Sequence, residues 1–212
     1  MEFVSITGLV ADTDVAQTKL VESADNTDSS VITYTAVNSP VETGYYAGYY
    51  GGGFNDGTTV TVYGTDNYTV DLSSGYYYPA INIDATYSSG MNYLFGDSGA
   101  NVIIAGMGNS ALWGDSDYES DLLVGGWGYD TFYCGKYEGN DMVLNGGAND
   151  TVWLYNTSFF DIIQTTYDGT SIGLLFNTGT SLFVACTDLL SPAFLTAEGG
   201  LFVFNRVTGS WQ

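Results

Sequence analysis

The sequence predicts an all-β protein built as a parallel β-roll, a solenoid with two edges, with β caps at both ends. A glycine- and aspartate-rich segment repeats with a period of about nine residues, and apolar residues recur in phase with it. Short alternating segments flank this segment on both sides, and no helical period stands out. We expect three regions: a Thr-, Asn- and Tyr-rich β flank with an N-terminal cap (1–91), the roll (92–153) and a second β cap (154–212).

The central segment contains one repeat that fits the pattern G-G-x-G-x-D-x-U-x at every specified position, where U is a large apolar residue. This repeat spans residues 125–133. Degenerate copies begin at Ala105 and Asn145, and copies with two extra residues span 114–124 and 134–144. The sixth positions are therefore spaced 9, 11, 9, 11 and 9 residues apart, at Asn101, Ser110, Asp121, Asp130, Asp141 and Asp150.

The alternation of long and short copies predicts the shape of the roll. If two consecutive repeats form one coil, the long copies stack on one edge and the short copies on the other. The U residues then face inward from short parallel strands and build a thin continuous core. These residues are Ile103, Leu112, Leu123, Phe132, Val143 and Val152. Ile81 and Ile83 are expected to start the same ladder, which would make the first flank an imperfect early part of the solenoid.

The composition indicates a metal ion at the turns. The chain has 24 acidic and 3 basic residues, a net charge of −21 and no histidine, yet 45% of its residues are hydrophobic, which argues for a packed fold. Oxygen ligands without histidine or clustered cysteine favour Ca²⁺. Glycines permit sharp turns in which carbonyl oxygens converge beside the sixth-position carboxylate, so turns of successive coils can enclose the ion. The candidate ligand positions are Asp97, Asn101, Asp115, Asp121, Asp130, Asp141 and Asp150, with the turn glycines Gly125, Gly126, Gly128 and Gly139.

The repeats resemble those of RTX (repeats-in-toxin, haemolysin-type) proteins over about residues 92–153. The resemblance implies a right-handed β-roll that folds on binding calcium. It also implies export through a type I secretion apparatus by an uncleaved C-terminal signal, and hence a secreted, extracellular or cell-surface protein. Several positions depart from the pattern: Asn101 and Ser110 replace the aspartate, Asp97 and Asp115 replace the second glycine, and Ala148 replaces the fourth. We therefore expect the first coil to bind calcium more weakly than the later coils.

Other functions are disfavoured by the residues present. The Gly-Asp-Ser-Gly peptide at 96–99 matches the surroundings of a serine-protease nucleophile, but without histidine the usual base is missing. Glu119 and Glu138, 19 residues apart, are expected to stack, and calcium coordination or a solvated rim is favoured over a catalytic pair. The acidity disfavours nucleic acid as a partner, and no apolar run is long enough for a membrane span. Cys134 and Cys186 allow either one disulfide bridge or two free thiols.

The flanks contain segments that alternate as strands do, at 31–37, 58–63, 68–72, 171–177, 181–186 and 201–205. The tyrosine- and glycine-rich segment 44–54 is either an aromatic platform for glycan or another copy, or a glycine-rich loop that covers the end of the roll. The expected function is a non-catalytic, calcium-dependent folding and secretion module of an extracellular surface protein or exoprotein. The alternative is an adhesive or self-assembling surface protein that uses the tyrosine-rich flank.

Overall fold

The structure is a computed structural model of the 212-residue chain. It describes residues 7–8, 19–25, 31–37, 44–49, 58–65, 67–73, 80–186 and 191–212, and up to Thr58 and at Tyr63 it describes the backbone alone. This described part is all-β: its strands form two large sheets, and its one helical element is a 3₁₀ turn at Phe159–Asp161. None of the described residues forms a helix long and apolar enough to cross a membrane.

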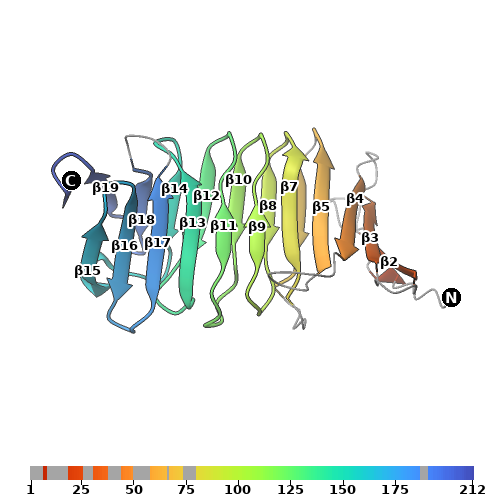
Figure 1. The fold of residues 1–212 in the computed structure, drawn as a ribbon, viewed down its shortest axis with the longest axis horizontal. Helices are drawn as coiled ribbons and strands as arrows, with labels where there is room; N and C mark the ends of the chain where they lie inside the picture. The colour runs from red at the N-terminus through yellow and green to blue at the C-terminus, as the bar shows by residue number, and fades with distance from the viewer. Residues whose placement is uncertain are drawn as a thin grey trace.

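The centre of the molecule is a solenoid in which consecutive strands alternate between the two sheets. One sheet contains β5 (Thr58–Gly64), β7 (Asn82–Ser88), β9 (Val102–Ile104), β11 (Leu122–Val124) and β13 (Asn140–Gly146). The other contains β6 (Tyr68–Asp71), β8 (Asn92–Phe95), β10 (Ser110–Trp113), β12 (Asp130–Cys134) and β14 (Thr151–Leu154). All neighbours in these two sets pair in parallel, and Figure 1 shows the strands side by side along the long axis. The parallel solenoid predicted from the repeats is confirmed.

The register confirms the predicted apolar ladder. In the first sheet Ile83 pairs with Ile103, Ile103 with Leu123, and Leu123 with Val143. In the second sheet the corresponding row runs through Leu94, Leu112, Phe132 and Val152. None of these eight side chains is more than 1% exposed, and all belong to one core. Burying an aliphatic or aromatic side chain of this size stabilises a fold by about 1.5–3 kcal/mol, so the repeated U position supplies much of the roll's stability.

The first flank is in part the early solenoid that was expected, since β5, β6 and β7 belong to it and Ile83 pairs with Ile103, but the strands before β5 differ. These earlier strands are β1 (Thr7–Gly8), β2 (Lys19–Asp25), β3 (Val31–Val37) and β4 (Gly44–Tyr49). They form an antiparallel meander that joins the first sheet through β5, so the solenoid begins at β5. The first part of the tyrosine-rich segment is therefore a strand rather than a loop, and residues 50–54 lie outside the described residues.

After β14 each sheet gains one more parallel strand, and the strands beyond it pair in antiparallel fashion. The added strands are β15 (Ile162–Tyr167), β16 (Ser171–Phe176), β17 (Ser181–Cys186), β18 (Ala193–Thr196), β19 (Leu201–Asn205) and β20 (Ser210–Trp211). β17 extends the first sheet beside β13, and β18 extends the second beside β14. The others return as antiparallel neighbours (Figure 1). Cys134 and Cys186 are both buried, and neither forms a disulfide bridge, so of the two alternatives the structure shows the one without a bridge.

Candidate functional site

The turns of the solenoid form two edges, as the alternating repeat lengths predicted. We call the turns 96–101, 114–121 and 135–139 the long edge, and the turns 105–109, 125–129 and 147–150 the short edge. At the end of each turn, or at the first or second residue of the next strand, lies a sixth-position residue of the repeat. Asn101, Asp121 and Asp141 lie on the long edge, and Ser110, Asp130 and Asp150 lie on the short edge. All six are buried.

A repeated hydrogen bond joins these positions from coil to coil. On the long edge, Oδ1 of Asp121 accepts the backbone N–H of Asn101 at 2.8 Å, and Oδ1 of Asp141 accepts that of Asp121 at 3.1 Å. On the short edge, Asp130 accepts the N–H of Ser110 at 2.8 Å, and Asp150 accepts that of Asp130 at 2.9 Å. Each sixth-position carboxylate therefore ties its coil to the coil 20 residues earlier.

On the short edge, amide donors also reach the second oxygen of each carboxylate. Oδ2 of Asp130 accepts the backbone N–H of Gly126 at 2.7 Å, and Oδ2 of Asp150 accepts that of Gly147 at 2.6 Å. Burial nevertheless raises the pKa of Asp130 to about 6. Since both oxygens of each carboxylate accept amide hydrogens, the turns themselves satisfy these side chains.

The long edge is different, because its sixth-position carboxylates lack a donor to the second oxygen. No hydrogen bond among the described residues reaches Oδ2 of Asp121 or of Asp141. Oδ2 of Asp117 and Oδ1 of Asn101 are buried and likewise have no partner within the described part of the chain. The long edge thus combines buried oxygens with unused acceptor capacity.

Electrostatic repulsion adds to this deficit. Burial, together with the neighbouring carboxylates of Asp141, Asp117 and Glu138, raises the pKa of Asp121 to about 9. Burial and two of the same neighbours, Glu138 and Asp117, raise the pKa of Asp141 to about 8. Burial is also the main reason why the pKa of Glu138 rises to about 7. The four groups favour the neutral acid as long as no cation lies beside them.

We call Asp117, Asp121, Glu138 and Asp141 the long-edge cluster. No basic side chain of the repeat region pairs with it. Lys136 is the one basic residue in the sequence between 92 and 153. Its Nζ lies 2.8 Å from Oδ2 of Asp161, which is outside the cluster. The charges that act on Asp121 and Asp141 are therefore those of other carboxylates, not that of a basic side chain of the repeat region.

The oxygen atoms available on the long edge are of the kinds that bind calcium. Gly139 has a φ of +82°, and a Cβ placed on it would lie 1.9 Å from the carbonyl oxygen of Glu119 and 2.8 Å from that of Tyr118, so these oxygens approach the next coil closely. A Cβ on Gly114 would collide with the carboxylate of Asp121. Carboxylate and carbonyl oxygens are the ligands that Ca²⁺ takes. However, the described residues contain no group of three His, Cys, Asp or Glu side chains arranged to hold a metal ion, so backbone carbonyls would have to complete the shell.

Two of the predicted ligand positions have other structural roles. Asp97 is fully buried, and its oxygens accept hydrogen bonds from the backbone N–H groups of Ile81 and Gly99 and from the amide of Asn101. The Gly-Asp-Ser-Gly peptide is thus a hydrogen-bonded turn. Asp115 is only half-buried and has a φ of +120°, a conformation that favours glycine. It occupies the position where the repeat pattern has its second glycine.

The predicted turn glycines of the short edge allow the coils to stack closely. A Cβ on Gly126 would lie 1.7 Å from the carbonyl oxygen of Gly106, and one on Gly128 would lie 2.5 Å from that of Gly108. A Cβ on Gly125 would lie 3.0 Å from both the carbonyl oxygen of Asn145 and the ring of Phe132. Any larger residue would push neighbouring coils apart.

The structure separates the two glutamates that were expected to stack. Glu119 is exposed, whereas Glu138 is 1% exposed. Glu138 accepts hydrogen bonds from Nε1 of Trp113, at 3.0 Å, and from the hydroxyl of Tyr155. The 20-residue coil places Glu119 level with Gly139, so a spacing of 19 is one residue out of register. Glu138 and Asp117 join the long-edge cluster from the inserted residues, which the repeat pattern leaves unspecified.

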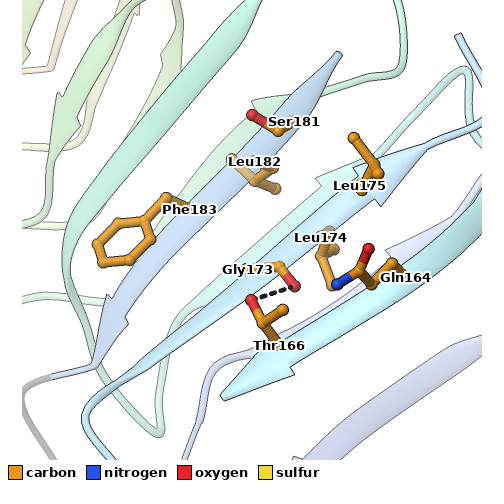
Figure 2. A pocket seen from close by; sticks show the side chains of 8 residues that line it. All are labelled: Gln164, Thr166, Gly173, Leu174, Leu175, Ser181, Leu182 and Phe183. Carbon is orange, nitrogen blue, oxygen red and sulfur yellow. Dashed lines mark hydrogen bonds between the residues drawn. The ribbon is translucent and has the colours of Figure 1, made fainter. Parts of the chain in front are cut away.

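Figure 2 shows a pocket that sequence reasoning did not identify, on β15, β16 and β17. It has a volume of about 270 Å³ and is lined by Gln164, Thr166, Gly173, Leu174, Leu175, Ser181, Leu182 and Phe183. The Thr166 hydroxyl donates to the carbonyl oxygen of Gly173 at 3.4 Å. No ionisable side chain lines this pocket, so it offers no group for acid–base chemistry.

No protein-family model, curated protein or solved structure matches the chain, so its own residues carry the functional argument.

Proposed function

We propose that this protein is a non-catalytic, calcium-dependent folding and secretion module of an RTX-like extracellular surface protein or exoprotein. The observation that carries the proposal is the long-edge cluster of Asp117, Asp121, Glu138 and Asp141. Burial raises the pKa of each of these carboxyl groups, and neighbouring carboxylates raise it as well. The one basic side chain of the repeat region, Lys136, pairs with Asp161 instead. Buried charges of one sign are stable in a fold only when they are paired or bind a metal.

Calcium is the cation that this donor set favours. The available atoms are carboxylate, amide and carbonyl oxygens, and the sequence contains no histidine. Ca²⁺ accepts six to eight such oxygens in flexible geometry, whereas Mg²⁺ demands a tighter octahedron. The ligands come from successive coils, so binding and folding are coupled.

This coupling supports a role in export. Affinities of extracellular calcium modules are on the order of 10⁻⁴–10⁻³ M, so such a chain stays unfolded at the low calcium concentration of the cytosol. It then folds outside the cell, where calcium is abundant. The apolar C-terminal strands β16 to β19, similar to the secretion region of RTX proteins, are the segment that a type I apparatus would recognise in this proposal.

An adhesive surface protein is the second candidate. The observation that favours it is the exposure of large aromatic side chains on the turns: Trp127 is 92% exposed, Tyr118 69% and Tyr129 62%. Exposed aromatic residues of this kind mark contact surfaces for glycan or for further copies. In this reading the solenoid is the scaffold and the edges carry the contacts.

Circular dichroism and light scattering of the full chain, in EDTA, in Ca²⁺ and in Mg²⁺, test both candidates. For the calcium module we expect Ca²⁺ to increase β structure and the melting temperature, and Mg²⁺ at equal concentration to do little. An EDTA-treated sample with an unchanged spectrum and melting temperature would contradict it. Scattering that rises with protein concentration in calcium would favour the adhesive, self-assembling candidate.

A further inference from the structure

A row of aromatic side chains runs along the outer face of the second sheet. In the parallel register Phe95 pairs with Trp113, Trp113 with Tyr133, and Tyr133 with Trp153. Each is the next residue after a buried ladder residue, so its side chain points to the opposite face of the sheet. The repeat thus places one aromatic ring per coil at the same register position on the outer face of the second sheet.

Together with Tyr155, these residues line a pocket of about 440 Å³. All five lining residues are aromatic, and all five are half-buried. Their rings do not form one flat surface. Phe95 and Trp113 meet at 78°, Trp113 and Tyr155 at 88°, and Tyr133 and Trp153 at 37°. The rings therefore border the pocket at several different orientations.

Glu138 positions two of these rings from behind. Its Oε1 accepts the Nε1–H of Trp113 at 3.0 Å and the hydroxyl hydrogen of Tyr155, and the glutamate itself is 1% exposed. The polar hydrogens of Trp113 and Tyr155 are therefore used inside the protein. What these two residues present to a ligand is their ring surface, which offers little to the hydroxyl groups of a sugar.

We propose that this pocket is an aromatic cage for a quaternary ammonium group of the choline type. The faces of aromatic rings carry negative electrostatic potential, and several rings around one point favour a soft, weakly hydrated cation. The charge of the chain is complementary to that ligand: it is −21, and ten bound calcium ions would still leave one negative charge. A neutral apolar ligand gains nothing from this charge.

The site goes beyond the proposed calcium module, since four of its five rings lie on the outer face of the sheet, and only Tyr155 lies in a turn, after β14. The test is isothermal titration calorimetry of the full chain in saturating calcium, with choline chloride as the probe. The control is 3,3-dimethyl-1-butanol, which has the same shape without the charge. We expect choline to bind about tenfold more tightly than the alcohol, which corresponds to about 1.4 kcal/mol. Equal affinities, or no binding of choline, would overturn the proposal.

Variants locate the binding. Tyr133→Leu keeps an apolar side chain but removes a ring from the middle of the row, so it should weaken choline binding about tenfold. Phe160→Leu is the control, because Phe160 is also aromatic and is 93% exposed on the 3₁₀ turn, outside the row, and it should leave the affinity unchanged. Phe95→Leu, at the end of the row, provides a second test if Tyr133→Leu fails to fold by circular dichroism.

Two further outcomes would contradict the assignment. If Phe160→Leu weakened choline binding as much as Tyr133→Leu, the cation would lie elsewhere on the surface. If cellohexaose bound and lost affinity in Tyr133→Leu while choline did not bind, the row would be a glycan platform instead. Because every titration is made on protein whose calcium-dependent folding has been checked, failure of the cage and failure of the calcium module give different results.

Discussion

The backbone N–H of Asp121 donates a 3.1 Å hydrogen bond to the carboxylate of Asp141, one coil later, while the carboxylate of Asp121 accepts the N–H of Asn101, one coil earlier. The two buried acids thus stabilise the stacking of the coils through one oxygen each and repel each other through their charges. The same side chains that hold the roll together oppose its folding when no cation is present.

Replacing each acid by its amide should therefore have opposite effects on the two edges. Asp121→Asn keeps an acceptor for Asn101 and removes a group that must either be buried as a charge or take up a proton on folding, so we expect a higher melting temperature in EDTA and a higher calcium concentration at the folding midpoint. Asp130→Asn, the matched change, puts an N–H₂ group against one of its two amide donors, from Gly126 or Ser110. It should lose about 1–3 kcal/mol with or without calcium. Thermal melts of both variants in EDTA and in calcium check this. If the melting temperatures of the two variants changed in the same direction in EDTA, the proposed difference between the edges would be contradicted.

In EDTA, the stability of the roll should increase as the pH falls. The pKa is raised to about 9 in Asp121, about 8 in Asp141 and about 7 in Glu138. A carboxyl group with a raised pKa in the folded state holds its proton longer there than in the unfolded chain, where it titrates at about 4. Its contribution is complete below pH 4 and is lost progressively as the pH rises towards 9.

Melting temperatures measured in EDTA between pH 5 and pH 8 check this dependence. Saturating calcium should remove it or reverse it, because the ion replaces the protons between the carboxylates. A melting temperature in EDTA that rose with pH would contradict the burial of uncompensated acids on the long edge.

Phe132→Ser should destabilise the roll even in saturating calcium. Phe132 is fully buried in the ladder, and losing a buried aromatic side chain costs about 3–5 kcal/mol. Tyr129→Ser is the control, since Tyr129 is 62% exposed on the adjoining turn. Urea denaturation should give a lower midpoint for Phe132→Ser than for Tyr129→Ser. Equal midpoints would argue against the assignment of Phe132 to the core and of Tyr129 to the surface.

Asp115→Gly should stabilise the calcium-free roll. At a φ of +120° an L-residue is strained by about 1–2 kcal/mol, which glycine avoids, although glycine also gives the unfolded chain more freedom. Gly139→Ala is the opposite change, because its φ is +82° and the carbonyl oxygen of Glu119 occupies the place of a Cβ. Denaturation in EDTA should give a small gain for the first and a clear loss for the second. If calcium also binds Asp115, the gain disappears in calcium.

The spacing of the repeats was enough to predict the coil, its two edges and the ladder from Ile103 to Val152. A repeat is a local pattern that is copied along the chain, so residues at equal positions stack whenever the coils do. The flanking strands at 31–37, 181–186 and 201–205 were predicted equally well, because alternation is also local. Pairing direction is not local, and only the structure showed that β1–β4 and β15–β16 run antiparallel to their neighbours.

The candidate site depended on the tertiary structure in the same way. From the sequence, Asp121 and Asp130 are equivalent sixth-position residues. Only the packing of turns decides that amide groups surround Asp130 while other carboxylates surround Asp121. Glu138 carries no periodic signal, and its burial behind Trp113 and Tyr155 follows from the stacking of neighbouring coils. The period of the repeat can be read from the sequence. The burial of a side chain and the charges near it depend instead on the residues of the neighbouring coil.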